Sequence, residues 1–149
     1  MLIDSHAHLD MDRFDADRDA VFARAREAGV GGVLNVSCDL ASIRSTLALA
    51  EERENVWAAL GVHPHDAASW NGEIEEEIKR GLLRERTVAV GEIGLDYYRD
   101  LSPRDTQQEV FRRQIGIALR FEKPIVVHSR DAFEDTVRIL REEGASSVG

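Results

Sequence analysis

Short apolar runs alternate along this chain with longer segments whose apolar residues recur at helical spacing. The apolar runs predict five strands, over residues 2–8, 31–37, 56–62, 87–93 and 124–128. The longer segments predict five helices, over residues 15–28, 40–53, 71–85, 103–121 and 132–143. Strands that alternate with helices in this way indicate a parallel sheet with right-handed crossovers. Two α/β architectures fit this description, an open doubly wound sheet and a (β/α)8 barrel.

Local signals at the helix ends agree with these boundaries. Ser102 is expected to cap the fourth helix, with Pro103 at its first position, where a missing N–H costs nothing. Asp131 and Glu134 resemble a capping box at the start of the fifth helix. Glycines that suit a helix end follow the first and fifth helices, at Gly29 and Gly144. The apolar stripes of the first three helices are Val21, Phe22 and Ala25; Ile43, Leu47 and Ala50; and Ile74, Ile78 and Leu82.

The composition is that of a soluble globular protein. The length of 149 residues is that of one domain, which we expect to extend over residues 1–149. Hydrophobic residues make up 43% of the sequence and charged residues 32%. No apolar run approaches the roughly 20 residues that span a bilayer, and the N-terminus lacks the pattern of a secretory signal. Cys38 is the only cysteine, so a reducing, cytoplasmic location is expected. We expect Cys38 to be a small buried residue near a strand end rather than a catalytic thiol.

The net charge of −9 narrows the kinds of ligand to be expected. A protein that binds nucleic acid through a broad phosphate-contacting face usually carries a basic stripe, and this sequence has none. If the substrate is a phosphodiester, the positive charge that binds its phosphate has to be local to the site, and bound metal is the obvious source of that charge.

Four of the five predicted strands end in a side chain that can bind a metal ion or a polar ligand. His6 and His8 end the first strand, His63 follows the third, Glu92 ends the fourth and His128 ends the fifth. The carboxyl ends of parallel strands gather at one edge of the sheet, and residues i and i+2 of a strand face the same side. Two imidazoles so placed can approach one cation together, and groups from other strands can complete the site. We therefore expect His6, His8, Glu92 and His128 to bind metal.

Two loops add candidates for substrate contact. His63 and His65 flank Pro64, and we expect His63 to contact the substrate phosphate or the leaving group, as a catalytic and substrate-binding residue. A structural role in the loop is expected of His65. Arg130 follows His128 by two residues and can reach an anionic substrate, although an ion pair with carboxylates at the start of the next helix accounts for it equally well.

Five motifs, in their order and spacing, resemble those of the TatD family of metal-dependent deoxyribonucleases: DSHAHLD, GVHPH, GEIGLDYY, FRRQIGIAL and KPIVVHSRDAF. The resemblance extends over essentially the whole chain. It implies a (β/α)8 barrel of the TIM type, in the amidohydrolase-like group of metallohydrolases. It further implies two divalent cations (Mg, Mn or Zn) and hydrolysis of DNA, in single strands or at DNA ends, commonly in the 3′→5′ direction.

The resemblance also implies roles for the residues at the strand ends. His6 and His8 would hold one cation, Glu92 would bridge both cations, and His128 would belong to the second. Glu92 would then be catalytic as well as a ligand, because it fixes the spacing of the cations. The implied mechanism is in-line attack on phosphorus by a metal-bound hydroxide, while His63 or Arg130 stabilises charge on the phosphate.

The length departs from the family pattern. A complete barrel has about 250 residues, whereas this chain contains about five of the eight βα units and ends where the sixth strand would begin. The family draws a further histidine and an aspartate from later strands. We expect a shortened form of a longer enzyme, whose open sheet edges favour self-association. Two alternatives stay open: hydrolysis of another ester or amide by the same barrel, and an inactive half-barrel.

Overall fold

The structure is a computed structural model that describes residues 2–145. Through these residues runs a sheet of five parallel strands in the order β1-β2-β3-β4-β5. The strands are β1 Leu2–Ala7, β2 Val30–Val36, β3 Val56–Leu60, β4 Thr87–Asp96 and β5 Ile125–Arg130. The α-helices are α1 Arg18–Glu27, α2 Leu40–Glu52, α3 Gly72–Leu82, α4 Arg104–Arg120 and α5 Phe133–Glu142. Two short 3-10 helices, η1 Asp12–Phe14 and η2 Pro64–Ser69, were not predicted.

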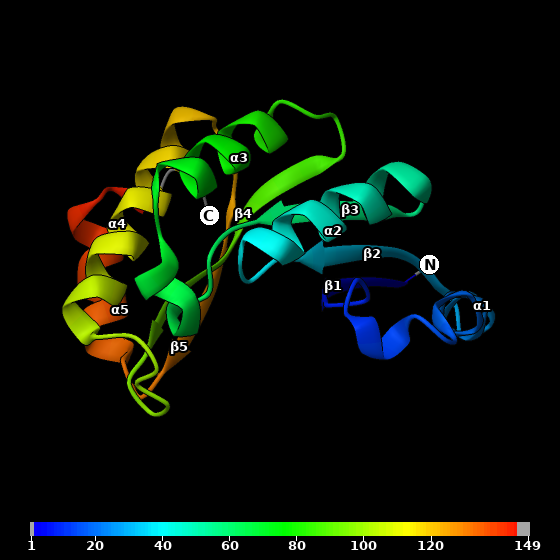
Figure 1. Cartoon of the computed structure of the whole chain (residues 1–149), viewed down its shortest axis with the longest axis horizontal. Coiled ribbons are helices and arrows are strands. Elements are labelled where there is room, and N and C mark those ends of the chain that lie inside the picture. The colour runs from blue at the N-terminus through cyan, green and yellow to red at the C-terminus, as the bar shows by residue number, and fades with distance from the viewer. Residues whose placement is uncertain (1, 146–149) are drawn as a thin grey trace.

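The sheet curls into a half-barrel, and the helices follow one another along its outer side (Figure 1). A doubly wound sheet would carry helices on both faces. The strand order, in which every strand pairs with its neighbours in sequence, is also that of a (β/α) barrel. The predicted α/β class and the incomplete parallel barrel of the TIM type are therefore confirmed.

The core lies between the sheet and the helices. All six predicted stripe residues of α2 and α3 are buried: Ile43, Leu47, Ala50, Ile74, Ile78 and Leu82. In α1 only Phe22 is buried, while Val21 and Ala25 are half-buried. α1 lies at one end of the half-barrel, and only one of its sides faces another helix of the described chain (Figure 1). Its stripe is therefore covered less completely than the stripes of α2 and α3.

Two predicted helix caps are wrong, for different reasons. The Ser102 hydroxyl donates to the carbonyl of His65 at 2.8 Å and accepts from the N–H of Ala68 at 3.0 Å, so it ties two loops together. Pro103 occupies the N-cap position of α4 instead. Asp131 has a φ of +52°, and α5 begins beyond it, with Ala132 at an N-cap that has no side-chain hydrogen bond.

β4 and β5 are both longer than predicted. β4 continues from the predicted end at residue 93 to Asp96, and β5 continues from residue 128 to Arg130. The added residues pair with each other, Leu95 with Ser129 and Asp96 with Arg130. The extension matters because it places the Asp96 carboxylate beside the predicted site.

Within the described residues, β1 and β5 each pair on one side only. Leu2 and Ile3 on β1 are 63% and 62% exposed, which shows that this edge strand lacks a covering layer. None of the helices in this part of the chain combines the length and apolar character needed to cross a membrane.

Candidate metal centre

The carboxyl ends of the strands bring the predicted site residues together. His6 lies on β1 and His8 follows it, His63 precedes η2, Glu92 lies on β4 and His128 on β5. Polar contacts of 3.9 Å or less link all five side chains into one cluster. Three separate strands and a loop thus deliver imidazoles and a carboxylate to the same place.

His6, His8 and Glu92 form the first group of potential metal ligands. The Nε2 atoms of His6 and His8 are 3.3 Å apart, and they lie 3.1 Å and 3.8 Å from Oε2 of Glu92. The Nδ1 atom of His8 is 2.7 Å from the carbonyl oxygen of Val36. Because a carbonyl only accepts, Nδ1 of His8 carries the proton, and its Nε2 has a free lone pair.

This geometry fits a divalent cation. Ligand atoms at about 2.0–2.1 Å from a tetrahedral ion lie roughly 3.3 Å from one another. The three distances in the first group, from 3.1 to 3.8 Å, are close to that separation. A histidine that donates its other ring N–H to a backbone carbonyl, as His8 does to Val36, is also the usual arrangement of a metal-binding imidazole.

A buried polar network fixes the loop that carries His8. The Asn35 side chain is fully buried on β2 and accepts from the N–H of Leu9 at 2.6 Å. Its amide donates to Asp10 and to Thr46, each at 2.8 Å. The chain after β1 is thereby held against β2, which limits the positions open to His8. Sequence reasoning missed Asn35, although an Asn inside an apolar strand was a visible signal.

The second group lies on the other side of Glu92. Nδ1 of His128 is 3.0 Å from Oε1 of Glu92 and 3.2 Å from Nε2 of His63. The hydrogen bond with Glu92 raises the pKa of the His128 imidazole despite partial burial. Burial, followed by the neighbouring His128, lowers the pKa of His63 from 6.5 to about 4. His63 is therefore neutral at pH 7.

Glu92 stands between the two groups and presents one oxygen to each. Oε2 faces His6 and His8, whereas Oε1 faces His128 and His63. Burial opposes ionisation of this carboxyl, but the hydrogen bond from His128 and the field of the other imidazoles outweigh it and lower its pKa to about 2. Glu92 is therefore ionised at neutral pH.

Asp96 and His65 join the cluster, and the sequence reading assigned neither of them to it. Oδ2 of Asp96 is 2.7 Å from Nε2 of His65 and 3.0 Å from Nε2 of His128. Burial opposes ionisation, but hydrogen bonds from the N–H of Arg99 and from both imidazoles lower the pKa of Asp96. The available signal was the spacing of Glu92 and Asp96, four residues apart on one strand.

Arg130 does not form the ion pair that was one of its two expected roles. Its guanidinium carbon lies 3.9 Å from the ring centroid of Tyr98, in a cation–π contact at the end of β5. Among residues 2–145, no carboxylate pairs with Arg130 at ion-pair distance. The cationic group is exposed, so contact with an anionic substrate stays a prediction.

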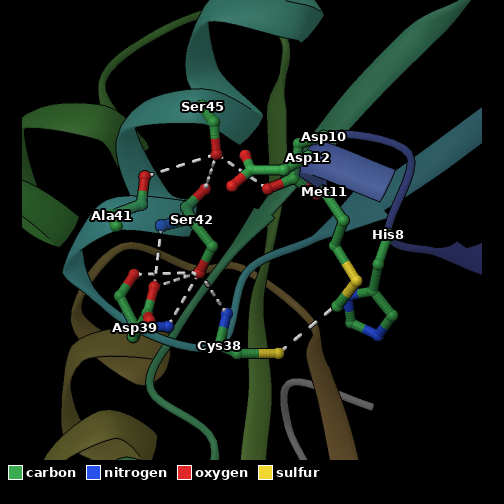
Figure 2. A pocket seen from close by; sticks show the side chains of 9 residues that line it. All are labelled: His8, Asp10, Met11, Asp12, Cys38, Asp39, Ala41, Ser42 and Ser45. Carbon is green, nitrogen blue, oxygen red and sulfur yellow. Dashed lines mark hydrogen bonds between the residues drawn. The ribbon is translucent and has the colours of Figure 1, made fainter. Parts of the chain in front are cut away.

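A pocket of about 450 Å³ opens beside His8, between the chain after β1 and the start of α2 (Figure 2). Asp10, Asp12 and Asp39 supply carboxylates to its lining, which disfavours a phosphate there. Cys38 is half-buried on the same wall, with Sγ 3.9 Å from Nδ1 of His8. Burial, and then the nearby carboxylates, raise the pKa of the Cys38 thiol to about 12, so it is no thiolate nucleophile at neutral pH.

The curled parallel sheet is an incomplete (β/α) barrel, and the imidazoles and carboxylates at the carboxyl ends of its strands form a candidate metal site. The family model "TatD related DNase" matches residues 3–149. The chain belongs to that family.

Similar proteins agree with this assignment. "Uncharacterized metal-dependent hydrolase YabD" of Bacillus subtilis is 44% identical over all 149 residues, which cover 58% of its length. "3'-5' ssDNA/RNA exonuclease TatD" of Pectobacterium parmentieri is 34% identical over 93% of this chain and 54% of its own. The crystal structure of YJJV, a TatD homolog from Escherichia coli, superposes with a TM-score of 0.88 at 33% identity, covering 95% of this chain and 56% of that one. The chain thus spans little more than half the length of these relatives.

Proposed function

We propose that this chain supplies the cation-binding residues of a nuclease site that hydrolyses DNA phosphodiester bonds from the 3′ end of single strands. The observation that carries the proposal is the position of Glu92, whose two oxygens face two separate groups of imidazoles. A relative named as a 3'-5' ssDNA/RNA exonuclease supports the choice of substrate. Because the net charge of the chain is −9, bound cations would have to supply most of the positive charge that offsets the phosphate at the site.

In this proposal the chain holds two divalent cations, drawn from Mg, Mn or Zn. His6 and His8 would hold the first, His128 the second, and Glu92 both. When bound, the cations would polarise the scissile phosphate and activate water. His63 is neutral and lies beside Glu92 and His128, where it would donate a hydrogen bond to a phosphate oxygen.

A hydrolysis assay on the 149-residue chain tests the proposed activity. The purified protein is incubated with Mn²⁺, Mg²⁺ or Zn²⁺ and with single-stranded DNA that carries a label at its 5′ end. We expect a ladder of products shortened from the 3′ end, which disappears when EDTA is added. A panel of amides and carboxylic esters, incubated in parallel, measures the competing substrate classes.

Two results would refute the proposal. Turnover of esters or amides without cleavage of DNA would indicate a different hydrolase. Absence of all turnover with every cation would indicate an inactive half-barrel. Glu85→Gln serves as the matched control in each assay, because Glu85 is exposed and has no contact with the cluster; it should cleave DNA at the rate of the unmodified chain.

We also propose that this chain associates with itself through its open sheet edges. Leu2 and Ile3 expose apolar surface on β1, and unpaired edge strands are known association sites. Size-exclusion chromatography with light scattering should show a dimer or larger species, and Ile3→Lys should shift it toward the monomer. Leu83→Lys, on a 77% exposed residue at the end of α3, should leave the association unchanged. A monodisperse monomer at every concentration would contradict the prediction.

A further inference from the structure

The Asp96 side chain uses its two oxygens for different purposes. Oδ1 accepts from the backbone N–H groups of Tyr98 at 3.1 Å and Arg99 at 2.7 Å, which closes the turn after β4. Oδ2 faces the Nε2 atoms of His65 and His128 at 2.7 Å and 3.0 Å. The side chain is completely buried. Its orientation is therefore fixed by the turn on one side and by the two imidazoles on the other.

The contacts with Asp96 and His63 together determine which nitrogen of a neutral His128 carries the proton. An ionised carboxylate only accepts hydrogen bonds, so Nε2 of His128 carries a proton. Oε1 of Glu92 also accepts, 3.0 Å from Nδ1, but Nδ1 lies 3.2 Å from Nε2 of His63 as well, which can donate to it. In a neutral His128, which carries one proton, Nδ1 is then the nitrogen with the lone pair. When His128 carries a second proton, that proton lies on Nδ1 and makes the hydrogen bond to Glu92; a bound cation would take its place between Nδ1 and Oε1.

The other imidazoles of this cluster are placed differently. Nδ1 of His63 accepts from the backbone N–H of His65 at 3.1 Å, so Nε2 of neutral His63 carries the proton. Nε2 of His65 donates to Asp96. Although His63, His65 and His128 lie close enough to surround an ion, His63 thus lacks a free lone pair on the nitrogen that faces His128. The hydrogen bonds favour Nδ1 of His128, with Glu92, as the ligand pair.

We infer that Asp96 is a positioning residue, which holds His128 in the Nε2–H tautomer and so directs Nδ1 toward Glu92 as a ligand atom. The inference rests on the proposed function only in assuming that a cation is what Nδ1 binds. Buried carboxylates that orient a ligating imidazole are common in metal sites, and their loss typically lowers metal affinity 10- to 100-fold, as an order of magnitude.

Asp96→Asn tests the inference with little change of shape. The carbonyl oxygen of the variant amide can still accept from the turn, while its NH₂ group now donates toward His128 and favours the Nδ1–H tautomer. Long-range ¹H–¹⁵N NMR spectra of the histidine-labelled, metal-free chain at alkaline pH report the tautomer directly. We expect Nε2–H for His128 in the unmodified chain and Nδ1–H in Asp96→Asn. Titration with Zn²⁺ should show an affinity at least about tenfold lower for the variant.

Two controls separate positioning from a general structural effect. Asp100→Asn changes an exposed carboxylate that pairs with Arg104 outside the cluster, and His65→Gln removes the other imidazole partner of Asp96. Both should keep His128 in the Nε2–H form. An Nδ1–H signal for His128 in the unmodified chain, which can be read even if Asp96→Asn does not fold, would overturn the inference. So would an unchanged tautomer in Asp96→Asn. A tautomer switch in a chain that binds no Zn²⁺ would support the role of Asp96 and refute the proposed cation site.

Discussion

Replacing Glu92 by Gln is expected to lower the affinity of this chain for divalent cations by at least about 100-fold. Changes in residues that merely orient a ligand already cost 10- to 100-fold, as an order of magnitude, and Glu92 is placed to contact both cations itself. The substitution keeps the size of the side chain but removes the negative charge between the two groups of imidazoles. Isothermal titration calorimetry with Zn²⁺ or Mn²⁺ measures both affinity and stoichiometry.

The unmodified chain should bind two cations, because the groups on either side of Glu92 are separate. In Glu92→Gln the imidazoles persist, so weak residual binding is expected rather than none. Glu85→Gln changes the net charge by the same amount on an exposed residue and should bind as the unmodified chain does. Binding of two cations by Glu92→Gln at unchanged affinity would show that Glu92 is not their shared ligand.

Replacing Gly94 by Ala is expected to destabilise the fold by at least about 2 kcal/mol. Gly94 lies on β4 directly beside His128 of β5, and its φ is +143°, a conformation that residues with a side chain rarely adopt. A Cβ atom there would overlap the carbonyl oxygen of His128. Because the obstacle is backbone, β5 has to move away, and His128 moves with it. Urea unfolding followed by circular dichroism measures the loss.

Gly116→Ala is the matched control for this prediction. Gly116 lies inside α4, is exposed, and a Cβ atom built on it meets nothing within 4 Å. Ala should stabilise the helix there by about 0.5–1 kcal/mol, because Gly loses more backbone entropy on folding. If Gly94→Ala unfolds at the same urea concentration as the unmodified chain, then the close approach of β4 and β5 does not constrain position 94.

The order of the strands and helices could be predicted from the sequence because it depends on the local spacing of apolar residues. The stripes at Ile43, Leu47 and Ala50 in α2 are buried as predicted. Residues within one turn of helix or one strand decide such patterns. The sequence also determined which side chains reach the edge of the sheet, because parallel strands place their carboxyl ends together whatever the details of the loops.

The tertiary structure decided what these side chains contact. Asp96 belongs to the cluster because β4 continues three residues beyond its predicted end. The turn after β4 then fixes the Asp96 carboxylate through the N–H of Arg99. The path of η2 places the imidazole of His65 against Asp96. The hydroxyl of Ser102 donates to the carbonyl of His65 in that same segment, and so does not cap α4 as predicted. Such hydrogen bonds join residues 30 or more positions apart. No local pattern encodes them, since they form only when the curled sheet brings distant loops together.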